Sequence, residues 1–292
     1  MVLNYQFKGK NMNNLKTLME KSREKKALDE FIGAVYKKDG EIKFRFRKDY
    51  EKLFVPAALY DEFLGGKNYD GVIAFVIESP HIHEFKIDIS LYPEGRYNAR
   101  PLNNPSTKKY LKKMVEGPLK NFFSDRIKEG EIYLFLIVNY VQYQCSLGEK
   151  TDNYRDLLFV ANWMKNCRTD FLDRIKQYSP DLYVNSCTKG SINKKFLMDN
   201  FKLDISADKN SLLCAKETKG ILTLQDIVES ALEIEGMINK GNYLKYNHPS
   251  YFVYQEARGN GNIFYPAPKF LDENSIIYFG KQKKTGDNPG LF

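Results

Sequence analysis

Apolar residues along this chain fall into short runs that predict β-strands. Segments 72–77 and 131–138 are almost entirely apolar, a pattern typical of central parallel strands whose two faces are both buried. Segment 41–47 alternates apolar and charged residues, which indicates a half-buried strand. Segments 181–185 and 242–246 predict two further short strands.

Apolar residues at helical spacing predict helices around these strands. The predicted helices span residues 13–38, 49–63, 106–127, 154–165, 169–178 and 222–239. Strands that alternate with helices indicate βαβ units and a mostly parallel sheet. We therefore predict an α/β fold, with a three-layer α/β/α arrangement around a central sheet of about four strands and an N-terminal helical extension.

One α/β domain accounts for most of the chain. We assign residues 66–292 to this domain, with an insert near 188–221, and residues 1–65 to the helical extension packed on it. Segment 79–105 contains four prolines and many turn residues, so it predicts a long loop. Loops of this length in compact domains are usually functional or disordered.

The composition indicates a folded, basic protein. Hydrophobic residues make up 42% and aromatic residues 14% of the chain, which is enough for a core. The net charge of +8 favours polyanionic partners such as DNA, although lysines that only solvate the surface explain it equally well. The apolar runs are far shorter than the roughly 20 residues of a membrane span, and the N-terminus lacks a signal-peptide core. We therefore expect a cytoplasmic monomer without a membrane partner.

The cysteines do not form a metal-binding motif. Cys145, Cys167, Cys187 and Cys214 include no Cys-x-x-Cys pair, so a zinc ribbon is not indicated. We expect free, mostly buried thiols in a reducing compartment, and no cofactor.

Polar residues follow three of the predicted strands at the point where each strand ends. Glu78 and Asn139 directly follow the two apolar strands, and His248 follows the last strand. His248 is one of only three histidines in the chain, and the other two are His81 and His83. In open α/β sheets, ligands bind at the carboxyl ends of the strands. A carboxylate, an amide and an imidazole gathered there predict an active site.

The ordered set of strand-end motifs resembles the uracil-DNA glycosylase superfamily, above all the branch found in thermophilic bacteria and archaea. Glu78, Pro80 and Glu84 match the Glu, Pro and second Glu of that branch's first motif, Gly-Glu-Ala-Pro-Gly-x-x-Glu. The strand that ends at Asn139 and the His248-Pro249-Ser250 turn are similar to its later motifs. The resemblance implies a DNA glycosylase that flips a base out of the duplex and hydrolyses its N-glycosidic bond.

Several departures from the branch's pattern point to a reshaped base site. Ser79 replaces Ala, His81 replaces the Gly after Pro80, and Leu102 replaces a base-stacking Phe. The loop between Glu84 and Pro101 is longer than in the family, and the cysteines do not match the spacing of the family's iron–sulfur cluster. The resemblance implies that the base-binding residues are Ser79, Pro80, His81, Leu102 and Asn139. As a hypothesis, the substrate is a bulky modified pyrimidine rather than uracil, in repair or in antiviral defence.

The expected catalytic residues are Glu78, His248 and Asn139. Hydrolysis of a glycosidic bond develops positive charge on the sugar and negative charge on the leaving base. A carboxylate stabilises the sugar cation and activates water, and a neutral imidazole donates a hydrogen bond to the base oxygen. The amide of Asn139 offers a donor and an acceptor to a base edge. Taken singly, each residue also suits a turn at a strand end, and the catalytic roles require the three side chains to converge on one site.

Residues beside these motifs are candidates for DNA contact. Tyr251 and Phe252 follow the histidine motif and suit either a wedge between base steps or burial in the core. Ser250 is a candidate phosphate ligand. Lys108 and Lys109 suit either salt-dependent attraction to DNA or a solvated helix face.

The sequence leaves two other functions open. One is a metal-dependent hydrolase, with His81 and His83 as a metal pair completed by His248, Glu78 or Glu84. Alternation along an extended chain sends His81 and His83 to opposite sides, which disfavours this site unless a turn intervenes. The other is a nucleic-acid-binding module that keeps the fold but lacks chemistry. A nucleotide-binding Rossmann enzyme is disfavoured, since no glycine-rich phosphate loop follows the first apolar strand.

Overall fold

The computed structural model describes just over half of the chain. The backbone is described for residues 10–24, 26–46, 69–80, 84, 105–145, 151–190, 192–193, 221–249, 251–252 and 269–270. Within these ranges, side chains are described except at residues 10–16, 105–108, 151–154, 164, 192–193, 221–222 and 269–270. The described part includes every strand that was predicted to end at a candidate site residue.

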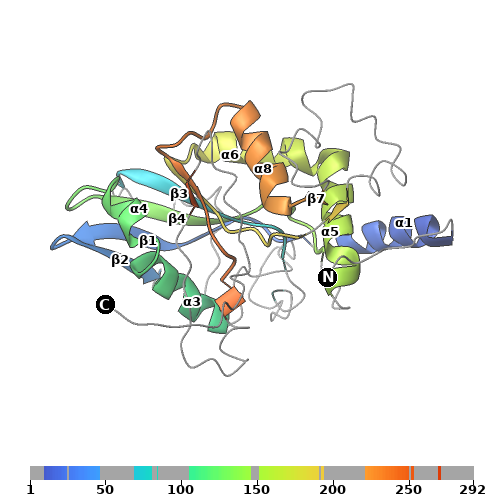
Figure 1. The fold of residues 1–292 in the computed structure, drawn as a ribbon, viewed down its shortest axis with the longest axis horizontal. Helices are drawn as coiled ribbons and strands as arrows, with labels where there is room; N and C mark the ends of the chain where they lie inside the picture. The colour runs from blue at the N-terminus through green and yellow to red at the C-terminus, as the bar shows by residue number, and fades with distance from the viewer. Residues whose placement is uncertain are drawn as a thin grey trace, which may run out of the picture.

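A seven-stranded sheet forms the centre of the molecule, in the order β2-β1-β4-β3-β5-β8-β9 (Figure 1). Its strands are β1 (Glu30–Lys38), β2 (Glu41–Phe46), β3 (Gly71–Ile77), β4 (Ile132–Asn139), β5 (Leu182–Asn185), β8 (Tyr243–Lys245) and β9 (Lys269–Phe270). The inner strands β4, β3, β5 and β8 are parallel to one another, whereas the β2/β1, β1/β4 and β8/β9 pairs are antiparallel. The predicted α/β class is confirmed. The predicted number of strands, about four, is wrong for the whole sheet and fits only its parallel centre.

Residues 30–38, predicted as the end of a long helix, form strand β1 instead. Helix α1 (Lys10–Arg23) ends before them, and β1 and β2 form an antiparallel hairpin. The turn is Asp39-Gly40, whose φ angles of 53° and 74° suit a two-residue hairpin. The apolar residues of β1 also fit a helical spacing. Packing between β2 and β4 outweighs that local preference, because most of β1 is buried inside the sheet.

Helix α1, in the predicted N-terminal extension, packs on α5 (Thr151–Asn162). Arg23 Nε donates to Asn162 Oδ1 at 2.8 Å, and Asn162 Nδ2 donates to the Ser22 hydroxyl at 3.2 Å. The predicted helix over 49–63 and the proposed domain boundary at 65 lie outside the described residues.

Helices follow the strands largely as predicted. Besides α1, the described helices are α3 (Pro105–Glu116), α4 (Lys120–Ser124), α5, α6 (Arg168–Tyr178) and α8 (Leu224–Ile234), with a π-helical turn, η4 (Trp163–Cys167), between α5 and α6. The helix predicted over 106–127 is two helices, α3 and α4. Gly117-Pro118 separates them, because proline lacks a backbone N–H and disfavours helical geometry in the residue before it.

The predicted insert near 188–221 begins and ends close to two paired strands. These are β6 (Ile192–Asn193) and β7 (Ile221–Leu222), which form a separate antiparallel pair. The residues between them, 194–220, lie outside the described residues.

Two apolar clusters cover the two faces of the sheet. Val76 of β3 and Val138 of β4 belong to the cluster under α5, α6 and α8, on the side that we call the α8 face. Ile77 and Ile137, their neighbours along the same strands, belong to the cluster under α3 and α4, on the α3 face. In Figure 1, α6 and α8 accordingly lie on one side of the sheet and α3 on the other. Successive residues of a strand therefore point to these two faces in turn.

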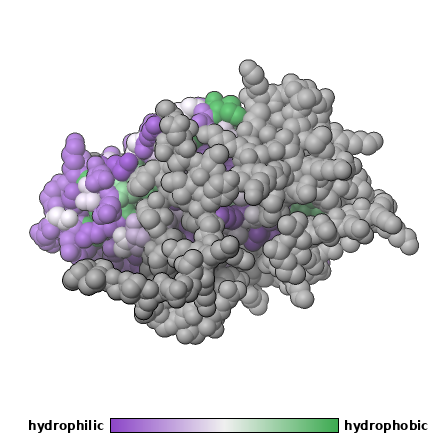
Figure 2. Space-filling model, in the orientation of Figure 1, coloured by the Kyte–Doolittle hydropathy of each residue, from purple (hydrophilic) through white to green (hydrophobic). Residues whose placement is uncertain are grey.

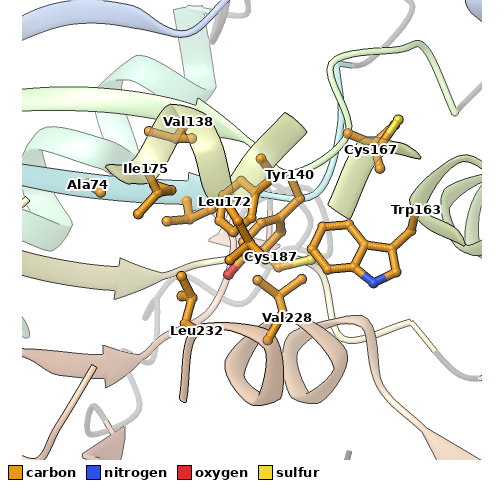
Figure 3. Close-up of a cluster of buried hydrophobic side chains, with 14 of the residues drawn as sticks. Ala74, Val138, Tyr140, Trp163, Cys167, Leu172, Ile175, Cys187, Val228 and Leu232 are labelled. Atoms are coloured by element: carbon orange, nitrogen blue, oxygen red, sulfur yellow. The ribbon is translucent and has the colours of Figure 1, made fainter. Parts of the chain in front are cut away.

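The cluster on the α8 face is rich in aromatic side chains. Figure 3 shows Tyr140, Trp163, Cys187 and Val228 gathered between the sheet and α8. The rings of Tyr140 and Trp163 are close to perpendicular, with centroids 6.3 Å apart. Such close packing gives the strand ends a rigid support from behind.

The described surface is mainly hydrophilic where the β1–β2 hairpin forms one end of the molecule (Figure 2). Among the described residues, the exposed large hydrophobic side chains are Ile132, Ile234 and Tyr251. None of the described helices combines the length and the apolar character that crossing a bilayer requires.

Candidate active site

The four parallel strands end at one edge of the sheet, where the candidate residues lie. Ile77, the last residue of β3, is in register with Asn139, the last residue of β4. Glu78 follows β3, and His248 lies three residues beyond β8. After β3 the chain forms β4 on one side of β3, and it then crosses over to form β5 on the other side. The topological switch point therefore lies between β3 and β5. Ligands of open α/β sheets bind outside the strand ends at such a point.

Glu78 is held as a carboxylate by Thr188, which follows β5. The Thr188 N–H donates to Glu78 Oε2 at 2.9 Å, and the Thr188 hydroxyl donates to Oε1 at 2.6 Å. The Glu78 carbonyl accepts the Val141 N–H at 3.0 Å, which fixes the main chain as well. Burial raises the pKa of Glu78, but His248, Arg155 and the two Thr188 hydrogen bonds together hold it below its ordinary value. Glu78 is therefore an oriented anion at neutral pH, although it is only 8% exposed.

His248 lies close enough to Glu78 for each group to influence the titration of the other. Burial lowers the pKa of His248, Glu78 raises it and Arg155 lowers it, and the net shift is downward. The imidazole is therefore neutral at neutral pH, and a neutral imidazole still donates one N–H. The His248 carbonyl accepts the Tyr251 N–H at 2.9 Å, so a tight turn fixes the backbone after the imidazole.

Arg155 of α5 supplies positive charge to the site, and the sequence pattern did not indicate this role. Its Nε and Nη2 atoms lie 2.7 and 2.6 Å from Asp156 Oδ1. Its charge lowers the pKa of both Glu78 and His248. Helical spacing gives no sign that Arg155 reaches the strand ends. Thr188, by contrast, follows a predicted strand, and the strand-end criterion that selected Glu78 would also have found it.

Asn139 has a fixed main chain, and its side chain has no partner among the described residues. Its N–H donates to Asp29 Oδ1 at 3.1 Å, and its carbonyl accepts Arg174 Nη2 at 3.0 Å. Asp29 also pairs with Arg174 and accepts the Tyr178 hydroxyl at 3.0 Å. The Asn139 side chain is 0% exposed, and its amide nitrogen and oxygen have no hydrogen-bond partner within the part of the chain that the structure describes. A buried amide without partners is costly, so a ligand that satisfies it gains affinity.

The structure brings Glu78 and His248 together and places Asn139 at the same edge of the sheet. Strand alternation directs the Glu78 side chain to the α8 face, where Arg155 lies. Asn139 is in register with Ile77, so the same alternation directs its side chain to the α3 face. The acid and the amide therefore approach the end of β3 from opposite faces, and a ligand must reach over this strand end to meet both.

The residues expected to bind the base are only partly described. Ser79 and Pro80 are buried directly after Glu78, and the Ser79 side chain is hydrogen-bonded to the Cys145 thiol, whose pKa burial raises. Four candidates lie outside the described residues, entirely or in their side chains: His81, Leu102, Lys108 and Ser250. The reshaped base site therefore stays a prediction.

Tyr251 and Phe252, the two candidate wedge residues, differ in exposure. Phe252 is 0% exposed, and its ring centroid lies 5.9 Å from that of Tyr110 and 6.2 Å from that of Tyr246. Phe252 is therefore a core residue that attaches the turn after His248 to α3. Tyr251 is 45% exposed and is the member of the pair that can reach a partner.

Two lysines of α3 lie around the same aromatic contact. Lys109 is exposed, and its Nζ lies 5.4 Å from the centroid of the Tyr110 ring; Lys113 Nζ lies 5.7 Å from it. Because Tyr110 packs on Phe252, these lysines and Tyr251 border one region of the surface. We call Lys109, Lys113 and Tyr251 the α3 basic patch.

Metal ligands are not gathered in the described part of the chain. There, no group of three or more His, Cys, Asp or Glu side chains is arranged to hold a metal ion. His81 and His83, the metal pair of the alternative function, lie outside it, as does Cys214. The three described cysteines are buried free thiols, as predicted: Cys145, Cys167 and Cys187.

Comparison of this chain with models of known families, with curated proteins and with solved structures gave no match. We therefore base its function on the geometry of the strand ends and on the resemblance of its motifs.

Proposed function

We propose that this protein is a DNA glycosylase-like hydrolase that flips a nucleobase and cleaves its N-glycosidic bond with water. The observation that carries the proposal is the pair formed by an ionised Glu78 and a neutral His248 at the switch point of the sheet. Base excision requires an anion near the sugar and a hydrogen-bond donor near the base, in these protonation states. The resemblance to the uracil-DNA glycosylase superfamily points to the same chemistry.

Glu78 acts on the sugar side of the bond. As the N-glycosidic bond breaks, its electron pair leaves with the base, and positive charge develops on C1′ and the ring oxygen of the sugar. The carboxylate stabilises this charge and accepts a proton from the water that attacks C1′. Because Thr188 orients both carboxylate oxygens beforehand, little reorganisation remains for the transition state.

His248 acts on the base side. Its neutral imidazole donates an N–H hydrogen bond to the base oxygen on which negative charge grows. The lowered pKa of His248 keeps the imidazole neutral, and the nearby guanidinium of Arg155 contributes to this shift. The base therefore leaves as an anion stabilised by a hydrogen bond, without prior protonation by the imidazole.

Asn139 recognises the base. Its amide presents a donor and an acceptor together, which matches the polar edge of a nucleobase. The absence of any other partner for this amide among the described residues supports a role in ligand binding.

DNA is the proposed partner. The net charge of +8 and the α3 basic patch favour a phosphate backbone. Base flipping costs a few kcal/mol, and the exposed ring of Tyr251 lies three residues after His248, where it can fill the vacated space. We further propose that the protein acts as a monomer in the cytoplasm, in a three-layer α/β/α domain, and that its substrate base is a modified pyrimidine.

A panel of oligonucleotides tests this function directly. Single- and double-stranded DNA carrying uracil, thymine, cytosine or bulky 5-substituted pyrimidines is incubated with the protein, treated with alkali and scored for breaks at abasic sites. We expect breaks at one class of modified pyrimidine. Efficient excision of uracil, with the modified bases ignored, would reject the substrate proposal but keep the glycosylase.

Glu78→Gln separates catalysis from binding. The glutamine keeps the size of the side chain but carries no negative charge, so excision should fall by at least about 100-fold while DNA binding is retained. No excision by the wild-type protein, together with intact binding of DNA, would identify a binding module without chemistry. Loss of excision on treatment with a chelator would indicate a metal-dependent hydrolase instead.

A further inference from the structure

Ser186 has a fully buried hydroxyl without a hydrogen-bond partner among the described residues. Its side chain is 0% exposed, and its Oγ makes no hydrogen bond to any residue in the described ranges. Ser186 directly follows β5, and its N–H donates to the Val76 carbonyl at 2.8 Å, so the ladder between β3 and β5 continues to this residue.

The side chains on either side of Ser186 show which face its hydroxyl takes. The Asn185 amide donates to the Gln225 carbonyl at 3.1 Å and to the Tyr243 hydroxyl at 2.8 Å, both on the α8 face. Cys187 belongs to the apolar cluster of that same face (Figure 3). Because residues of an extended chain alternate, Ser186 is directed to the α3 face.

Ser186 and Asn139 therefore share a face and an edge of the sheet. They lie at the carboxyl ends of β5 and β4, the two strands that flank β3. Two strand spacings separate them, roughly 10 Å between backbones. Ile77, buried and on the α3 face, lies between them at the end of β3. Two unsatisfied polar side chains thus border one apolar side chain.

We propose that Ser186 and Asn139 form the two polar sides of a base subsite, with Ile77 as its apolar floor. The ligand class is a planar heterocycle with hydrogen-bonding groups on two opposite edges. One edge pairs with the Asn139 amide, and the other pairs with the Ser186 hydroxyl, which donates or accepts. This inference rests on the proposed function and adds Ser186 as a residue that determines which base is accepted.

The energetics of buried hydroxyls provide a test. An unsatisfied buried hydroxyl destabilises the free protein, and removing it by Ser186→Ala is neutral or stabilising. In a base subsite, the same change removes a hydrogen bond to the ligand. We therefore expect Ser186→Ala to keep or raise the melting temperature and to lower kcat/KM by about tenfold on the accepted oligonucleotide.

Tyr140→Phe is the matched control. Its hydroxyl is also buried without a hydrogen-bond partner among the described residues, but it belongs to the cluster on the α8 face (Figure 3). This variant should affect the melting temperature as Ser186→Ala does and leave kcat/KM unchanged. A lower melting temperature for Ser186→Ala, with kcat/KM unchanged, would show that the hydroxyl holds a structural water and would overturn the subsite.

Calorimetry with free bases separates the subsite from the glycosylase activity. The full chain is titrated with uracil, thymine, cytosine and 5-hydroxymethylcytosine, as wild type and as Ser186→Ala. Binding of one base that weakens about tenfold in the variant supports the subsite even if no oligonucleotide is cleaved. Binding that is equal in both proteins, or absent from the wild type, rejects the subsite, and excision by the wild-type protein would still support the glycosylase.

Discussion

The Thr188 hydroxyl is one of several groups that set the charge state of the candidate acid, Glu78. Valine at position 188 keeps the size and β-branch of threonine but removes the hydrogen bond to Glu78 Oε1. Because that hydrogen bond lowers the pKa of Glu78, Thr188→Val should raise it. The acid limb of the profile of kcat/KM against pH should then move to higher pH, and kcat at neutral pH should fall by about tenfold. Steady-state excision kinetics across the pH range measure both effects.

Thr188→Ser is the control for this change, because serine keeps the donor and restores both the acid limb and kcat. A profile for Thr188→Val that matches the wild type would mean that the hydroxyl does not set the protonation of Glu78. A drop in kcat without a shifted limb would mean that the hydroxyl orients the Glu78 carboxylate but does not set its pKa.

The same site makes folding depend on pH. The pKa values of Glu78 and His248 are both lowered in the folded chain, so the unfolded chain binds protons that the folded chain does not. The contribution of His248 to the free energy of unfolding is complete above its ordinary pKa of 6.5 and is lost as the pH falls through its pKa in the folded chain. Glu78 adds a second loss below its ordinary pKa of 4.5. We expect the free energy of unfolding to decrease below pH 6.5. Urea denaturation at successive pH values measures this decrease, and His248→Gln should make its first part less steep. Equal slopes of the free energy of unfolding against pH in both proteins would contradict the prediction.

The sequence predicts some of these residues and not others, for a physical reason. Glu78 and His248 follow strands, and the end of a parallel strand is a position that local pattern reveals. Arg155 reaches the site from a helix, and only the packing of α5 on the sheet determines where its side chain ends. The missing partners of Asn139 are a property of the folded interior, which no spacing of residues encodes.

Among the secondary-structure elements, β4 is fixed at its carboxyl end by an ion pair from outside the parallel sheet. Asp29, which precedes β1, accepts the Asn139 N–H, and Arg174 of α6 donates to the Asn139 carbonyl. The hydroxyl of Tyr178, also in α6, donates to Asp29. Asp29→Asn removes one partner of a buried pair and should lower the free energy of unfolding by about 3 kcal/mol. The exposed partner of the same arginine, Asp170, lies 2.9 Å from Arg174 Nε, and Asp170→Asn should cost under about 1 kcal/mol. Equal losses of unfolding free energy in the two variants, measured by urea denaturation, would contradict the role of Asp29 in fixing the end of β4.

Element type is predictable where burial and local pattern agree. The sequence predicts β3 and β4 because their segments are almost entirely apolar, and both strands are largely buried on both faces. The helix predicted over β1 is wrong because its apolar residues fit either period, although Asp39-Gly40 is a hairpin signal in the sequence. Strand β9 has only two residues, so its antiparallel pairing with β8 depends on tertiary contact alone.

For the molecule as a whole, the sheet divides the proposed chemistry between its two faces. The α8 face brings the charges of Glu78 and Arg155 to the strand ends, and a tightly packed aromatic core supports them. The α3 face presents Asn139, and the α3 basic patch borders the turn that follows His248. We therefore propose that DNA delivering a base over the end of β3 passes along α3.

That path makes the dependence of binding on salt a test of the docking face. Replacing both Lys109 and Lys113 with glutamine should weaken DNA binding to a similar degree for every DNA sequence. It should also reduce the slope of log K against log salt by about 2, because each lysine that contacts a phosphate releases about one counterion. Lys128→Gln is the control: this lysine is 87% exposed, but it precedes β4 and lies at the amino ends of the parallel strands. Fluorescence anisotropy of a labelled duplex at several salt concentrations gives the slopes. An unchanged slope in the double variant would contradict docking along α3. So would a decrease of about 1 in the slope of Lys128→Gln, because the slope counts only the lysines that contact phosphates.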